Sequence, residues 1–197
     1  MREKGLDYKL NFGIEYSRIK ELAAGYKKSH QLAQALWKEN VRECKIMATL
    51  LQPVSSFCRE LAEIWIEDMK YPELAEYSVM NILQNVDYAS DVVFKWMADE
   101  RSRFRLCGYM LMSRLLMKGM KLNGRAEMEF MDHAFAEIKG DEPTVKKSAA
   151  TALKKFAAQS EENARMLGGQ LDILNERANP ELKHYIEGIK YDIEYCV

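Results

Sequence analysis

Aromatic and small residues recur along this chain at intervals longer than a single helix. Four aromatic residues end, or nearly end, an apolar helical pattern at spacings of 28, 31 and 39 residues: Trp37, Trp65, Trp96 and Phe135. Small residues follow in the next pattern, at spacings of 30, 30 and 41: Ala48, Ser78, Gly108 and Ala149. A drifting period of ~30–40 residues with two helices per unit is typical of HEAT-like repeats, because neither helix can bury its apolar stripe alone. The pattern predicts an all-α fold, a curved right-handed solenoid of HEAT-like antiparallel helix pairs, with an ordinary helical bundle as the alternative.

Helical periodicity fills most of the chain, and no stretch has the convincing alternation of a strand. The predicted helices cover residues 14–27, 31–37, 41–51, 57–69, 71–83, 87–97, 102–117, 125–138, 144–156, 162–175 and 180–195. Asn123-Gly124, Gly140-Asp141 and Asn179-Pro180 mark loops between them. A chain of 197 residues, 48% hydrophobic, can bury a sizeable core. We therefore expect residues 1–197 to form a single HEAT-like helical repeat domain.

The overall charge argues against a protein that is basic throughout. The net charge is -1 and the isoelectric point is near 6.4. Charge is unevenly spread, however, since residues 100–155 hold 12 Lys/Arg against 7 Asp/Glu, whereas residues 156–197 hold 4 against 8. A basic patch can therefore exist on a chain that is almost neutral as a whole.

The stretch 145–156 combines an apolar stripe and a basic face in one predicted helix. Five residues form an apolar stripe with helical spacing: Val145, Ala149, Ala152, Leu153 and Phe156. The opposite side and its flanks carry polar and basic residues: Lys146, Lys147, Thr151, Lys154 and Lys155. This face is either a solvated lysine surface or a helix that contacts phosphates, and the pattern alone leaves both open.

Other kinds of site lack a sequence pattern. The cysteines have no Cys-x-x-Cys spacing and are interpreted as reduced, mostly buried thiols of a cytoplasmic protein: Cys44, Cys58, Cys107 and Cys196. The three histidines are far apart, so we expect neither a metal site nor a cofactor. No signal peptide is visible, and no apolar run approaches the ~18 residues of a membrane span.

Several short stretches resemble, in order, the AlkD-like DNA alkylation repair family. The similar segments are residues 11–14, 30–37, 43–48, 77–83, 106–112 and 145–148, so the resemblance extends roughly over residues 11–160. It implies a HEAT-like solenoid that holds duplex DNA on a basic concave surface. It also implies a glycosylase that removes cationic alkylated purines, with a carboxylate stabilising the oxocarbenium ion and tryptophans packing against the deoxyribose backbone.

This chain departs from the family pattern at key positions. The family has a Trp-Asp pair, two intervening residues and then the catalytic Asp, and the corresponding positions in this chain are Pro72-Glu73 and Glu76. A second family tryptophan corresponds to Thr151, and an arginine expected ahead of the Cys107-Gly108 pair corresponds to Leu106. These departures put enzymatic activity in question and leave the predicted fold intact.

The resemblance and the charge pattern together define the candidate site. Glu76 is the predicted catalytic acid, and the predicted DNA-binding residues are Arg101, Arg103, Arg105, Lys146, Lys147, Thr151, Lys154 and Lys155. The expected protein is a monomer that binds duplex DNA, has weak or altered N-glycosylase activity on cationic alkylated purines, and does not bind membranes. The alternative is a non-catalytic scaffold that binds a protein or undamaged nucleic acid.

Overall fold

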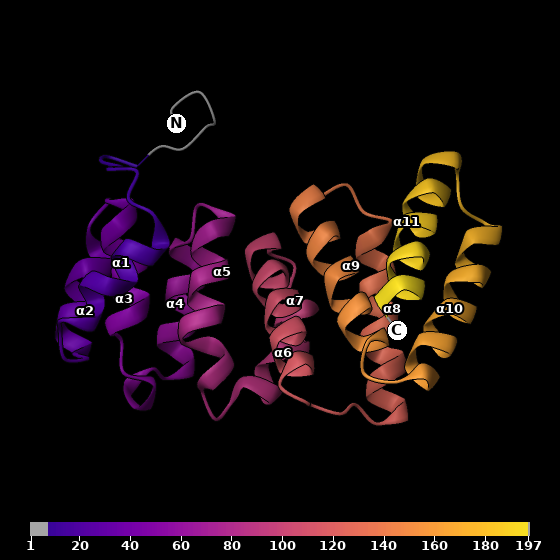
Figure 1. Ribbon diagram of the computed structural model, residues 1–197, viewed down its shortest axis with the longest axis horizontal. Helices are drawn as coiled ribbons and strands as arrows, with labels where there is room; N and C mark the ends of the chain where they lie inside the picture. The colour runs from indigo at the N-terminus through magenta and orange to yellow at the C-terminus, as the bar shows by residue number, and fades with distance from the viewer. Residues whose placement is uncertain (1–7, 197) are drawn as a thin grey trace. The chain divides into compact units, whose positions relative to one another are not determined.

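The computed structural model describes residues 8–196 and shows a chain built from helices (Figure 1). Within these residues no strand is formed, and one isolated bridge joins Leu10 to Val41. The chain divides into two compact units, Met1–Ala89 and Ser90–Val197. The predicted all-α fold is therefore confirmed over the described residues.

The described residues of the first unit, 8–89, form five α-helices that lie wholly within it and two short 3-10 turns. The helices are α1 (Tyr16–Ala24), α2 (His30–Lys38), α3 (Arg42–Leu51), α4 (Arg59–Asp68) and α5 (Pro72–Asn81), and the turns are Val54–Ser56 and Leu83–Asn85. The start of α2 is fixed by Ser29, whose hydroxyl accepts a hydrogen bond from Leu32 N. The start of α5 is fixed by Pro72 in its first turn, where a missing N–H is not needed.

Two layers of helices form the core of the first unit. The ring of Trp37 in α2 stacks on that of Trp65 in α4, with centroids 3.9 Å apart and an interplanar angle of 3°. Phe57 meets Trp65 edge-on. In the other layer α3 packs against α1 and α5. Helix α3 also packs against α2 of the first layer. Helices α1 and α3, α2 and α4, and α3 and α5 are thus in contact without being consecutive in the chain, which is expected of stacked repeats.

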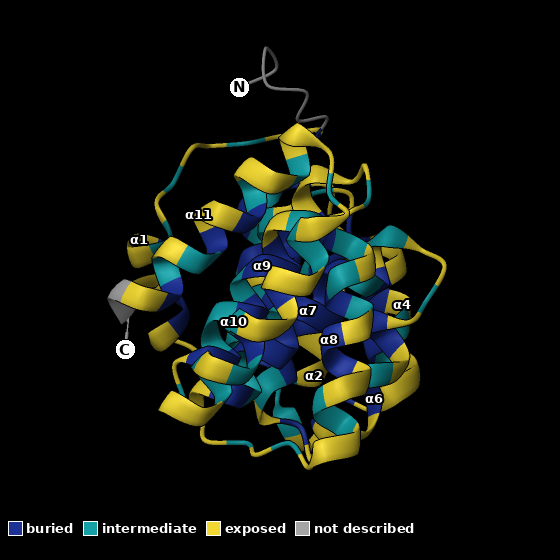
Figure 2. Ribbon diagram, turned by 90° about the vertical axis from the view of Figure 1, so that its right-hand side faces the viewer, coloured by how far each residue is buried: buried dark blue, intermediate teal, exposed yellow. Residues whose placement is uncertain are grey.

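The second unit is organised around α7 and α9. Its helices are α6 (Ala89–Met97, which begins at the last residue of the first unit), α7 (Ser102–Met117), α8 (Gly124–Ile138), α9 (Pro143–Ala157), α10 (Glu161–Glu176) and α11 (Pro180–Cys196). Helix α9 packs against α7, α8, α10 and α11. Phe130 of α8 meets Phe156 of α9 edge-on, with ring centroids 5.8 Å apart. Figure 2 shows buried residues gathered on α7 and α9, while α10 and α11 are mostly exposed or intermediate.

Gly108 lies at a close approach of two helices, α6 and α7. A Cβ atom at this position would lie 2.7 Å from Met97 N and 3.0 Å from the carbonyl carbon of Trp96. Because these are backbone atoms, only glycine allows α7 to pass so close to the end of α6.

The small residues of the predicted repeat pattern lie within helices and are all buried: Ala48, Ser78, Gly108 and Ala149. The three tryptophans are also buried, but the fourth aromatic position differs, because Phe135 is half-buried. In α8 the buried stripe runs through Phe130, Ala134 and Ile138, and Phe135 lies one position away from it. The cysteines also differ from the prediction of mostly buried thiols, because Cys107 is buried whereas Cys58 is exposed at the start of α4.

Candidate nucleic-acid interface

Helix α9 carries the main basic surface of the second unit. Val145, Leu153 and Phe156 are at most 2% exposed, and this buried stripe turns the opposite side of the helix outward. Lys147 is exposed and the other three lysines are half-buried. The helix has four lysines, two near each end, and no carboxylate, so all of its own charged side chains are positive.

Two of these lysines contact α11. Lys154 Nζ lies 2.9 Å from Asp192 Oδ2. Lys146 Nζ lies 4.8 Å from the ring centroid of Tyr185, whose hydroxyl donates a hydrogen bond to Lys146 O at 3.3 Å. Thr151 donates to a carbonyl of its own helix. Lys147 and Lys155 have no ion-pair partner among the described residues, so they are the lysines most readily offered to a ligand.

The arginines at the start of α7 are held by acidic and carbonyl oxygens. Arg101 donates to both carboxylate oxygens of Asp99 at 2.8 Å, and its backbone N–H adds a third bond at 2.9 Å. These contacts lower the pKa of Asp99 from 3.8 to about 2. Arg105 Nε lies 2.7 Å from Glu137 Oε1 in α8, and its Nη1 donates to the carbonyls of Asp99 and Glu100. Arg101 and Arg105 therefore stabilise the α6–α7 turn and the contact of α7 with α8.

Glu76 is exposed on α5 in the first unit, whereas the predicted DNA-binding residues all belong to the second. Next to it, Tyr77 stacks on Tyr16 of α1 with centroids 4.6 Å apart and an interplanar angle of 15°. Tyr16 donates a hydrogen bond of 2.8 Å to Asn81 Oδ1, which fixes the ring. Burial raises the pKa of Tyr77, and the negative charges of Glu73 and Glu76 add to that rise. Glu76 is thus an accessible carboxylate beside an ordered aromatic pair.

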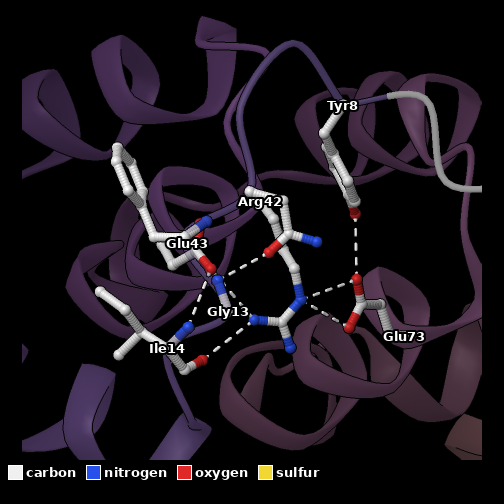
Figure 3. Close-up of polar contacts among 8 residues, drawn as sticks. Tyr8, Gly13, Ile14, Arg42, Glu43 and Glu73 are labelled. Carbon is white, nitrogen blue, oxygen red and sulfur yellow. Dashed lines mark hydrogen bonds and ion pairs between the residues drawn. The ribbon is translucent and has the colours of Figure 1, made fainter. Parts of the chain in front are cut away.

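A second carboxylate of α5, Glu73, is engaged in a polar cluster that Figure 3 shows. Arg42 Nε donates to both oxygens of Glu73, at 3.1 and 3.0 Å, and the Tyr8 hydroxyl donates at 3.3 Å. Burial, and then the charge of Glu73, raise the pKa of Tyr8. Arg42 Nη1 also donates to Ile14 O. Glu73 therefore joins α5 to α3 and to the segment before α1.

The same cluster fixes the backbone of residues 12–14. Glu43 is 7% exposed, and its two oxygens accept hydrogen bonds from Phe12 N and Ile14 N, both at 3.2 Å. Sequence reasoning missed Arg42 and Glu43. A signal for Glu43 existed, because it lies three residues before the fully buried Ile46 and so falls beside the apolar stripe of its helix.

The described part of the chain has neither a metal-binding cluster nor a membrane-spanning helix. Among residues 8–196, no three His, Cys, Asp or Glu side chains come close enough together to hold a metal ion. No helix formed by these residues combines the length and apolar character that crossing a bilayer requires.

The stacked helix pairs and the lysine-bearing α9 define a HEAT-like helical repeat protein with a basic surface helix. The profile of the DNA alkylation repair enzyme family matches residues 7–166, and the chain belongs to that family. A solved structure with the same fold was described as one of "a new family of proteins related to the HEAT-like repeat DNA glycosylases with affinity for branched DNA structures". It superposes with a TM-score of 0.76 at 16% identity, over 87% of this chain and 73% of that one. A comparison with curated proteins gave no match.

Proposed function

We propose that this protein binds duplex DNA through the outer face of α9. The observation that carries the proposal is the composition of that helix, which has four lysines, no carboxylate and an opposite side that is fully buried. Phosphate contacts supply most of the sequence-independent affinity of proteins for DNA, and lysines make such contacts as point charges. Membership of the DNA alkylation repair family supports DNA as the ligand.

We rank the proposed DNA contacts by the partners that each side chain already has. Lys147 and Lys155 come first because no described residue forms an ion pair with either. Lys146 and Lys154 come second because both contact α11. Arg101 and Arg105 come last, since a phosphate would have to compete with the carboxylates that already bind them. Arg103 and Thr151 complete the proposed set, and we expect a monomeric, cytoplasmic protein.

The salt dependence of binding tests this proposal. We expect a labelled duplex to bind at ~50 mM salt, with an affinity that falls steeply as salt is raised. Lys147→Ala should reduce the slope of log Kd against log salt concentration by about one unit. The matched control is Lys20→Ala, which removes the same charge from the exposed face of α1 and should leave the slope unchanged.

A four-way DNA junction in the same assay asks whether this chain shares the affinity for branched DNA stated for its structural relative. Absence of binding to both DNAs at ~50 mM salt, or a flat salt slope, would contradict the proposal and favour a non-catalytic scaffold for a protein partner.

Excision of cationic alkylated purines is a second candidate function, favoured by the accessibility of Glu76. Glu73 is occupied by Arg42 and Tyr8, whereas Glu76 is exposed beside the Tyr16–Tyr77 stack. A carboxylate in water stabilises a nearby cation only weakly, because the dielectric constant is high. DNA that covered Glu76 would exclude water and strengthen its attraction for an oxocarbenium ion. The positively charged base already leaves easily, so a single anion can be sufficient for weak activity.

Release of 3-methyladenine or 7-methylguanine from alkylated duplex DNA measures this activity. Glu76→Gln keeps the size of the side chain and removes its charge, so we expect base release to fall while DNA affinity stays the same. Equal release by the wild type and by Glu76→Gln would exclude Glu76 as the acid. No release by the wild type would leave DNA binding as the function.

A further inference from the structure

The last helix of the chain lies against the basic face of α9. Helix α11 begins at Pro180, beyond residues 7–166 that match the family. It contributes Asp192 to Lys154 and Tyr185 to Lys146. Lys154 lies on the side of α9 opposite its buried stripe, and Lys146 lies on a flank of that side. Figure 1 shows α11 in yellow next to the orange α9 in the second unit.

The charges of the two helices are complementary. Helix α9 has four lysines and no acid, whereas α11 has four acids and two lysines, a net charge of -2 with His184 neutral. A groove of about 810 Å³ runs between them. The charged residues that line it are three lysines and three acids: Lys146, Lys147, Lys154, Asp141, Glu181 and Asp192. Two of these acids come from α11, so this helix cancels much of the positive charge that α9 would otherwise present.

The attachment of α11 is suited to reversible opening. Only three of its described side chains are buried, Ile186, Ile189 and Ile193, and they form one stripe toward the rest of the unit. The Lys154 and Asp192 side chains are 32% and 48% exposed, so water already reaches the ion pair. A helix with few buried apolar contacts opens more easily than the well-packed core of a protein.

We propose that α11 is an autoinhibitory cover that weakens DNA binding by α9. Asp192 forms an ion pair with the Lys154 ammonium, which a DNA phosphate would otherwise contact. The inference rests on the proposed binding of DNA by α9. A carboxylate and a phosphate compete for the same three N–H donors, so binding at Lys154 displaces Asp192 and loosens α11. Because the Lys154–Asp192 ion pair is partly exposed, we expect this competition to weaken the affinity for DNA only about two- to five-fold.

Neutralising the competing carboxylate in the chain of residues 1–197 is the direct test. We expect Asp192→Asn to tighten binding of a labelled duplex about two- to five-fold at ~50 mM salt, and to steepen the salt slope by about one unit. The control is Glu187→Gln, which removes one negative charge from an exposed position of the same helix outside the groove. Equal tightening by both variants would show a general effect of net charge and overturn the proposal, as would no change in Asp192→Asn.

A double-mutant cycle with Lys154→Ala locates the competition at this pair. In the wild type Lys154 is occupied, so its removal should weaken DNA binding little, whereas in the Asp192→Asn background it should weaken binding about two- to five-fold more. Amide hydrogen exchange gives a second readout, because saturating DNA should speed exchange in residues 180–194. Slower exchange there, or additive effects in the cycle, would overturn the proposal.

The two proposals fail in different ways. If Lys147→Ala weakens DNA binding but Asp192 and Lys154 are not coupled, the autoinhibitory cover is wrong and DNA binding by α9 stands. If neither the wild type nor Asp192→Asn binds DNA, the proposed function itself is wrong.

Discussion

Arg42 and Glu73 are joined by a two-point contact in which one guanidinium nitrogen, Nε, lies 3.1 and 3.0 Å from the two carboxylate oxygens. The residues are 31 positions apart and connect α3 to α5. Their side chains are 12% and 27% exposed, so the contact is largely shielded from water. Tyr8 and the carbonyl of Ile14 complete the arrangement, which makes Arg42 a structural residue of the first unit.

Loss of this arginine should destabilise the protein. Arg42→Met leaves Glu43 and Glu73 without their cation in a partly desolvated cluster, and we expect the free energy of unfolding to fall by about 2–3 kcal/mol. Urea unfolding followed by circular dichroism measures this change. The comparison is Arg18→Ala, which breaks an ion pair with Glu21 whose side chains are 67% and 64% exposed and should cost less than ~1 kcal/mol. A similar loss in both variants would contradict the structural role of Arg42.

Replacing two glycines by alanine should change the free energy of unfolding in opposite directions. Gly108→Ala places a Cβ atom 2.7 Å from the backbone nitrogen of Met97, and the resulting shift should cost about 2–3 kcal/mol. Gly169 is exposed within α10, where a Cβ atom meets nothing within 4 Å. Gly169→Ala should therefore stabilise the helix by about 0.5–1 kcal/mol. Thermal unfolding of both variants checks the signs, and a stabilising Gly108→Ala would contradict the close helix approach.

The Asp99–Arg101 contact predicts a specific acid sensitivity. The pKa of Asp99 is about 2 in the folded protein against 3.8 as the ordinary value, so the folded state binds this proton more weakly than the unfolded state does. The contribution of the Asp99–Arg101 contact to the free energy of unfolding is therefore complete above about pH 4 and is lost as the pH falls toward 2. Because Arg101 is 51% exposed, screening reduces the contribution to about 1 kcal/mol.

The difference in unfolding free energy between wild type and Asp99→Asn isolates this contribution. We expect a difference of about 1 kcal/mol at pH 7 that disappears near pH 2. Asp132→Asn, a change at an exposed position of α8, should show no such dependence. A difference that stays constant with pH would mean that the charge of Asp99 is not what stabilises the turn.

Substitutions of Arg105 and Lys147 should have different effects, the first on the stability of the fold and the second on DNA binding. Arg105→Ala removes the partner of Glu137 and two donors to backbone carbonyls, so we expect a loss of about 2 kcal/mol in stability. Lys147→Ala should leave stability within ~0.5 kcal/mol and weaken DNA binding, because the side chain is exposed. Unfolding and DNA titration of both variants check this separation, and a stability loss in Lys147→Ala equal to that in Arg105→Ala would contradict it.

The amino-acid sequence by itself determined the helices and their buried faces. The range 102–117 predicted from periodicity is the observed α7, and the predicted ends of α9 differ from those observed by a single residue. These features depend on local patterns, since apolar spacing and residues such as Pro72 act within one or two turns. The burial of Gly108 was predictable for the same reason, because only a small residue suits a crowded helix contact.

Only the tertiary structure decided which charged side chains form ion pairs within the protein and which are accessible to a ligand. On the sequence, Glu73 and Glu76 look alike, and so do Lys147 and Lys154. Folding brings Arg42 to Glu73 across 31 residues and Asp192 to Lys154 across 38. Such pairs depend on how helices stack, and a helical pattern fixes the direction of a side chain without fixing its neighbour. The face of α9 could therefore be predicted, whereas its cover by α11 could not.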